Sequence, residues 1–201
     1  MLSTTAAGLL TGLALIIAIG AQNAHVLRQG LAREHVGLVV AICAVSDLVL
    51  ILAGVAGIGA VVEQAPWAIT VVTWVGVAFL TWYGVSALLR ARRNESLHAA
   101  TGARSSRSGV AVRTLALTLL NPHVYLDTVL LLGSIAASHG SPGRWWFALG
   151  ACVGSVVWFT GLGYAARAAS RLFARSRAWQ VLDVVIGLTM LAIAGSLALG
   201  A

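Results

Sequence analysis

The sequence predicts an all-α membrane protein with six transmembrane helices, arranged as two inverted three-helix repeats. The first observation behind this prediction is composition: of 201 residues, 59% are hydrophobic and only 9% are charged. Soluble domains contain roughly 25% charged residues. The mean hydropathy is +0.92. At about 20 residues per membrane-spanning helix, six spans and short loops use the whole length, so we expect a single transmembrane domain, 1–201.

The second observation is a series of six apolar windows. They cover 3–27, 37–61, 67–89, 113–137, 145–169 and 179–199. The first window lacks the basic flank of a cleaved signal peptide and is therefore interpreted as a retained span. The turn-forming sequence Ser141-Pro142-Gly143 separates the fourth window from the fifth. A polar loop at about 90–112 divides repeat A (about 3–89) from repeat B (about 113–199).

The third observation is the distribution of the 13 basic residues, which are all arginine. Twelve of them lie in or beside the first, third and fifth gaps between windows, and only Arg144 lies on the opposite side. Arginine and lysine concentrate in cytoplasmic loops of membrane proteins. We therefore expect a multi-pass membrane protein with both termini outside the cytoplasm. If the first window re-enters the membrane instead of spanning it, the number of spans becomes odd and the two termini lie on opposite sides.

Three helices per half make the second half enter the membrane from the opposite side, which is a common plan of secondary transporters. The tetrapeptides Asn23-Ala24-His25-Val26 and Asn121-Pro122-His123-Val124 occupy matching places in the two halves. Each lies in a segment interrupted by Gly or Pro, and such broken helices point to transport sites. From the distance to the nearest arginine, both asparagines lie roughly 8–12 Å inside the cytoplasmic boundary.

Two carboxylates fall well inside the apolar windows, Asp47 and Asp127. A charged side chain at the bilayer centre costs at least about 2.5–3.5 kcal/mol on insertion scales, so each is a functional hypothesis. The alternative is a structural acid bonded to neighbouring Ser, Thr, Trp or His side chains. Asp183 lies beside Trp179 at the start of the last window, and we expect it at the membrane interface.

Pro122 and two histidines extend the candidate site. Pro122 donates no backbone hydrogen bond, so it frees the carbonyl of Thr118 for a ligand or for a neighbouring helix. His25 and His123 are candidates for a proton relay because imidazole titrates near neutral pH. Packing through ordinary hydrogen bonds is the alternative for both histidines.

Four segments resemble the LysE/ArgO family of lysine and arginine exporters. They are Gly20 to Gly30 (GAQNAHVLRQG), Ser46 to Leu50 (SDLVL), Thr73 to Gly84 (TWVGVAFLTWYG) and Leu119 to Thr128 (LLNPHVYLDT). The similarity runs from about Gly8 to Gly195, and the four segments occur in the family's order. Ala21 stands where some members carry proline, which predicts a weaker break in the first helix.

The resemblance implies export of L-arginine, L-lysine or both across the bacterial inner membrane, driven by the proton gradient or the membrane potential. It implies that the substrate or the coupling proton meets Gln22, Asn23, Asp47, Asn121, Pro122, Tyr125 and Asp127. Two carboxylates would complement a substrate with two cationic groups, and proton antiport through Asp47 or Asp127 under alternating access is our hypothesis. We expect no cofactor, no metal and no nucleic acid, with lipid around the helices and a homodimer as one assembly.

Other functions fit parts of the same sequence. An exporter of neutral amino acids of the threonine or homoserine type would share the architecture. A membrane thiol oxidoreductase would use Cys43 and Cys152, which lie early in the second helix of each half but lack a C-x-x-C partner. A passive channel is a third alternative.

Overall fold

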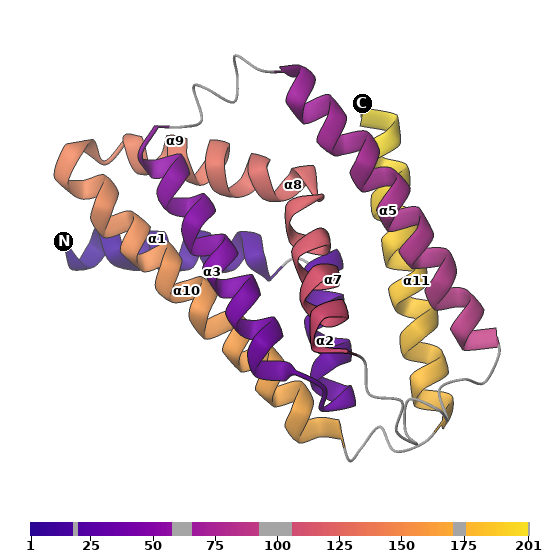
Figure 1. Ribbon diagram of the computed structural model, residues 1–201. Coiled ribbons are helices and arrows are strands. Elements are labelled where there is room, and N and C mark those ends of the chain that lie inside the picture. Colours follow the sequence, from indigo (N-terminus) through magenta and orange to yellow (C-terminus); the bar gives the residue numbers. More distant parts are fainter. Residues whose placement is uncertain (18–19, 58–65, 93–105, 171–175, 201) are drawn as a thin grey trace.

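The computed structural model describes residues 1–17, 20–57, 66–92, 106–170 and 176–200, and within these ranges it contains helices and no strand (Figure 1). Four helices are long and apolar enough to cross a membrane: α3 (Val36–Val55), α5 (Pro66–Arg92), α10 (Gly140–Ala169) and α11 (Ser176–Gly200). Two further apolar segments are sharply bent helix pairs. The chain is thus an all-helical membrane protein with four to six candidate spans.

The first apolar window is two helices, α1 (Leu2–Ile16) and α2 (Ala21–Ala32), inclined at 81° to each other. This corrects the expectation that the first helix has only a weak break. Gly20 has an extended backbone, with φ −112° and ψ 176°, and precedes α2. The sharp bend therefore lies before position 21. Ala21 is the first residue of α2, so the lack of a proline there does not reduce the bend.

The fourth window is also broken, as the sequence predicts. It consists of α7 (Arg107–Leu119), α8 (Pro122–Tyr125), the π-helical turn η1 (Leu126–Leu131) and α9 (Leu132–Ala137). The two parts are inclined at 61°. Pro122 occupies the first turn of α8, where a missing N–H costs nothing. Asn121 before it is extended, so proline starts a second helix here instead of bending a continuous one.

The boundaries of the later helices also differ from the predicted windows. Ser141-Pro142-Gly143 belongs to the first turn of α10, so the predicted turn is wrong by a few residues. The chain reverses at Gly140, whose φ of +73° is a backbone conformation that glycine adopts without strain. α5 and α7 both extend into the predicted polar loop, and 93–105 lie outside the described residues.

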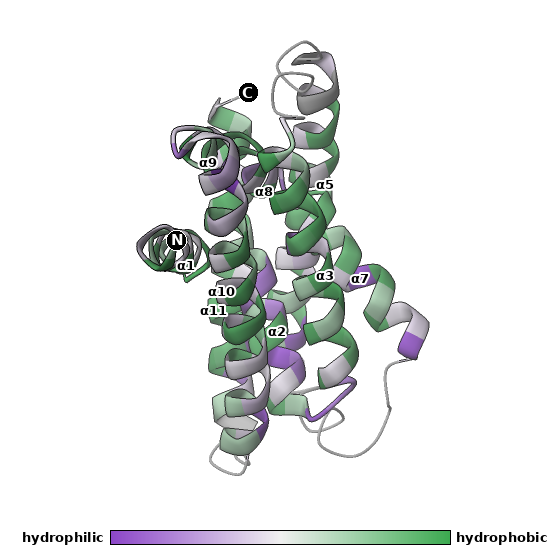
Figure 2. Cartoon of the chain, turned by 90° about the vertical axis from the view of Figure 1, so that its left-hand side faces the viewer, coloured by the Kyte–Doolittle hydropathy of each residue, from purple (hydrophilic) through white to green (hydrophobic). Residues whose placement is uncertain are grey.

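The long helices run between two ends of the molecule, whereas α1 runs across that direction and packs against α10 (Figures 1 and 2). Glycines let α1 and α10 touch: a Cβ built at Gly8 would lie 2.0 Å from the Phe147 carbonyl oxygen. α5 packs mainly against α11, with Gly84 facing Gly187. Figure 2 shows apolar outer helices and a hydrophilic α2 among them.

Most of the described arginines lie at one end of the molecule, as the sequence predicts. The C-terminal ends of α2, α5 and α10 and the N-terminal end of α7 lie together at the lower end of Figure 1. These elements carry Arg28, Arg90, Arg92, Arg107, Arg113 and Arg167, and Arg33 follows α2. Arg144 lies near the start of α10, at the opposite end. We call the lower end the arginine-rich end. Its location in the cytoplasm stays a prediction.

Candidate functional site

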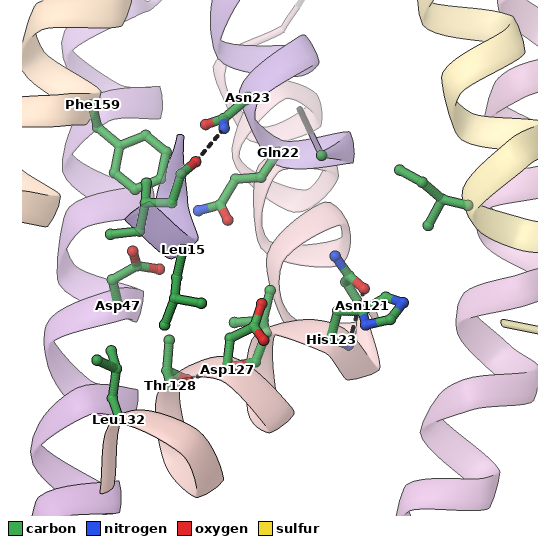
Figure 3. A pocket seen from close by; sticks show the side chains of 14 residues that line it. Leu15, Gln22, Asn23, Asp47, Asn121, His123, Asp127, Thr128, Leu132 and Phe159 are labelled. Atoms are coloured by element: carbon green, nitrogen blue, oxygen red, sulfur yellow. Dashed lines mark hydrogen bonds between the residues drawn. The ribbon is translucent and has the colours of Figure 1, made fainter. Parts of the chain in front are cut away.

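A cavity of about 280 Å³ lies where the two bent segments meet α3, α10 and α11. Its polar walls are formed largely by residues that the sequence singles out. They are Gln22, Asn23, Asp47, Asn121, His123 and Asp127, together with Thr128. Figure 3 shows these side chains around one space. Asn23 and Asn121, one from each half of the chain, thus line the same cavity, while their depth in the membrane stays a prediction.

Asp47 is a buried carboxylate on α3, with 3% of its surface exposed. Ser155 of α10 donates a hydrogen bond of 2.9 Å to its Oδ2. The buried Nε2 of Gln22 faces the same carboxylate without a well-formed hydrogen bond. A buried carboxylate is stabilised only by cations or several donors, so the cavity next to Asp47 suits a positively charged group.

Asp127 lies on the π-helical turn η1 and is half-buried. Single π-helical turns are rare and occur frequently at functional sites. His123, one helical turn earlier, also lines the cavity. In Figure 3 the Asp127 carboxylate points into the space that Asp47 and Gln22 also face. The two acids that the sequence singles out thus border one cavity from different helices.

The first break is stabilised by side chains of the site itself. The Asn23 Nδ2 donates a 2.6 Å hydrogen bond to the carbonyl of Ile16 at the end of α1. The Trp158 indole of α10 donates to the Asn23 Oδ1 at 3.1 Å. Asn23 therefore satisfies a carbonyl that the end of α1 leaves without an intrahelical donor, and α10 fixes its orientation.

Side-chain hydrogen bonds to the backbone also stabilise the second break, between α7 and α8. The Asn121 Oδ1 accepts a hydrogen bond of 3.2 Å from the backbone N–H of His123, which caps α8. The Tyr125 hydroxyl donates to the carbonyl of Leu119 at 2.9 Å. Pro122 and Tyr125 thus shape the break and are not among the residues lining the cavity. The carbonyl with a side-chain donor is that of Leu119, one residue beyond the predicted Thr118.

Two other groups lie away from the cavity. His25 is buried between the Tyr83 hydroxyl at 3.4 Å and the Thr114 hydroxyl at 3.1 Å. Asp183 is 1% exposed. It pairs with Arg28 at 3.2 Å and with Arg90 at 3.7 Å. The sequence reasoning did not predict these ion pairs, and the location of Asp183 at the membrane interface stays a prediction.

Sequence reasoning missed Ser155, Trp158, Phe159 and Thr128. Phe159 and Thr128 line the cavity, and the other two hold Asp47 and Asn23. Hydroxyl and indole groups are ordinary in membrane helices, so their presence gives little signal. Ser155 and Trp158 do lie three residues apart, which places them on one helical face. That spacing is the one signal that could have found them.

Among the residues that the structure describes, the thiols and acids do not form another type of centre. Cys43 is buried, Cys152 is partly buried, and both are free. In the described ranges no group of three or more His, Cys, Asp or Glu side chains is placed to hold a metal ion.

The arrangement of charges and dipoles suits a zwitterion with an additional positive charge. The first turn of α2 borders the cavity and has no side-chain cap. Helix N-termini attract carboxylates through their unpaired N–H groups and the helix dipole. Asp47 and Asp127 supply negative charge for ammonium or guanidinium groups. Broken backbone at membrane depth is tolerated where it lines such a cavity.

Comparison with known proteins gives a consistent result over the whole chain. Residues 13–201 match the family model described as LysE type translocator. The arginine exporter protein ArgO of Enterobacter sp. (strain 638) is 43% identical over 98% of this chain and 94% of its own length. ArgO of Klebsiella pneumoniae (strain 342) is 42% identical over 95% of this chain and 91% of its own length.

A third relative carries a different substrate in its name. The lysine exporter LysE of Corynebacterium diphtheriae is 37% identical over 94% of this chain and 96% of its own length. No solved structure matches the chain.

Proposed function

We propose that this chain, which belongs to the LysE type translocator family, exports L-arginine, L-lysine or both across the bacterial inner membrane. Its relatives are amino-acid exporters and not enzymes, which removes the thiol oxidoreductase from consideration. The choice of a basic amino acid as substrate rests on one observation: two carboxylates line the cavity between the two broken helices.

The cavity offers a partner for each charge of a basic amino acid. Asp47 and Asp127 would bind the two cationic groups of the substrate, the α-ammonium and the side-chain guanidinium or ammonium. The first turn of α2 would bind the α-carboxylate. The amides of Gln22 and Asn121 border the same space and offer further hydrogen bonds. A neutral amino acid has one cationic group and would leave one carboxylate of the cavity unpaired.

Alternating access fits this site, because one bent helix pair belongs to each half of the chain. This correspondence supports the arrangement as two inverted repeats, which place the substrate at their interface. A net cation leaving the cytoplasm moves against about 2.3 kcal/mol per 100 mV of membrane potential. Exchange for a proton on Asp47 or Asp127 would supply that free energy. His123 borders the cavity and could pass the proton, while His25 could do so only through Tyr83 or Thr114.

The test is efflux from a strain that lacks its own basic amino-acid exporters. Cells expressing the protein are fed arginine-, lysine- and threonine-containing dipeptides, and the free amino acids in the medium are measured in parallel. We expect arginine, lysine or both to appear faster than in cells with an empty vector. Threonine efflux should equal the vector control. Export of threonine without arginine or lysine would establish the neutral alternative instead.

A further inference from the structure

A cluster of charged and polar side chains lies between the cavity and the arginine-rich end. It contains the Arg28–Asp183 and Arg90–Asp183 pairs. Arg90 and Arg113 both lie over the Tyr83 ring, 5.9 and 5.8 Å from its centroid. The Tyr83 hydroxyl faces His25, whose other ring nitrogen faces Thr114. We call these seven residues, from α2, α5, α7 and α11, the arginine cluster.

The position of the arginine cluster follows from helix geometry. Asn23 lines the cavity, and Arg28 lies five residues farther along α2, about 8 Å at 1.5 Å per residue. On α11, Ile193 lines the cavity and Asp183 precedes it by ten residues, about 15 Å. Both displacements lead toward the arginine-rich end (Figure 1). The cluster therefore lies between the cavity and that end.

The arginine cluster forms the charged part of the contact between two groups of helices. α5 and α11 pack closely against each other, and α10 packs against α1, α2 and α3. The cluster joins the first pair to α2 and α7 through charges and hydrogen bonds. Small apolar side chains, such as Ala21 and Ala24 of α2, complete this interface. Separation of α5 and α11 from α2 and α7 would open a path through the cluster.

The ion pairs are suited to breaking and re-forming. The side chains of Arg28 and Arg90 are 14% and 27% exposed, but that of Asp183 is only 2% exposed. The Arg28 Nε, the Arg90 Nε and Nη2 and the Asp183 Oδ1 form no well-aligned hydrogen bond. Attraction without aligned hydrogen bonds contributes less than a bidentate pair. Buried charged groups without aligned partners cost free energy, so hydration of these groups in an opened path would offset the loss of the pairs.

We propose that the arginine cluster is the cytoplasmic gate of the transporter and that the structure shows this gate closed. The proposal rests on the proposed transport function and identifies the residues that regulate its cytoplasmic access. The cluster carries three arginines and one aspartate. In the closed state its excess positive charge repels basic amino acids that would return to the cytoplasm. Loss of the Asp183 pairs opens the cavity to the cytoplasm.

The test places one reporter cysteine in the cavity and measures from which face of the membrane it is modified. Val124 lines the cavity and belongs to neither the arginine cluster nor the proposed substrate contacts. Val124→Cys is combined with Cys43→Ser and Cys152→Ser. The probe is a charged, membrane-impermeant methanethiosulfonate, applied to right-side-out and inside-out vesicles. With the gate intact, modification should be faster from the extracytoplasmic face.

We expect Asp183→Asn and, separately, Arg90→Gln to raise the modification rate from the cytoplasmic face by about tenfold or more, through a shift in the population of the open state. Arg33→Gln is the matched control. Arg33 follows α2 at the same end and donates a hydrogen bond to Ser170, outside the cluster. The cytoplasmic modification rate of the Arg33→Gln variant should equal that of the parent.

Unchanged cytoplasmic rates in both cluster variants would overturn the gate. An equal increase from both faces would also overturn it, because such an increase indicates general loosening instead of opening toward one side. The assay contains no substrate. If arginine efflux fails, the result of the modification assay therefore still stands. If the gate is overturned, the result of the efflux assay still stands.

Discussion

At the scale of single residues, the two cavity acids differ in how the protein holds them. Asp47 is buried and accepts a hydrogen bond from Ser155, whereas Asp127 is half-buried on a π-helical turn. A buried acid with few donors favours a cationic partner more strongly than an exposed one. We therefore assign the tighter contact with the substrate cation to Asp47.

Replacing Asp47 with asparagine should reduce arginine efflux by about tenfold or more, equivalent to roughly 1.4 kcal/mol. The amide keeps the shape of the carboxylate but loses the charge that binds the cation. Efflux is measured at equal amounts of protein in the membrane. Glu34→Gln is the matched control, because Glu34 lies outside the cavity after α2. Equal efflux from Asp47→Asn and from the parent would remove Asp47 from the mechanism.

Thr114→Val should destabilise the protein by about 1–3 kcal/mol, because buried His25 loses a hydrogen-bond partner. Valine preserves the β-branched shape. Thr160→Val, on the exposed face of α10, is the control. The measurement is thermal unfolding of the purified protein in detergent. If both variants melt at the same temperature as the parent, the His25–Thr114 contact contributes no stability.

The sequence was informative about the cavity because polar side chains are conspicuous in apolar windows. This reasoning found Gln22, Asn23, Asp47, Asn121 and Asp127. It did not predict the ion pairs of Asp183, since nothing local predicts which arginines lie beside an acid. Tertiary packing decides those contacts.

At the scale of elements, the break at Pro122 was predictable and the sharp break at Gly20 was not. Proline removes a donor and clashes within a helix, so its effect is local. A single glycine only lowers helix stability by about 1 kcal/mol, and tertiary contacts decide whether the chain turns there. The π-helical turn that carries Asp127 also has no local signal in the sequence.

The crossing of α1 and α10 depends on glycines at the contact. A Cβ built at Gly150 would lie 1.9 Å from the carbonyl oxygen of Thr5. Gly150→Ala should therefore push α1 away and destabilise the protein by about 1–3 kcal/mol. Gly161→Ala on the same helix is the control, because no atom lies within 4 Å of its added Cβ.

Thermal unfolding in detergent distinguishes these two glycine variants. The Gly150 variant should melt at a lower temperature than the parent, while the Gly161 variant should match or exceed the parent. Equal melting temperatures for both would show that α1 does not pack on α10 as described.

At the scale of the whole molecule, the charge asymmetry predicts the topology. The described arginines other than Arg144 lie at one end, and α11 ends at the other end (Figure 1). A C-terminal alkaline phosphatase fusion should be active, because this enzyme folds only outside the cytoplasm. A fusion after Arg33 should be inactive. The opposite pattern would reverse the orientation and place the arginine cluster at the outer face.

The central claim is that the cavity between the broken helices binds a basic amino acid through its two carboxylates. Counterflow of labelled arginine into arginine-loaded proteoliposomes tests it most directly, because exchange needs the binding site but no driving force. Purified wild-type protein should accumulate the label, and Asp47→Asn combined with Asp127→Asn should match protein-free liposomes. Undiminished exchange by the double variant would contradict the claim.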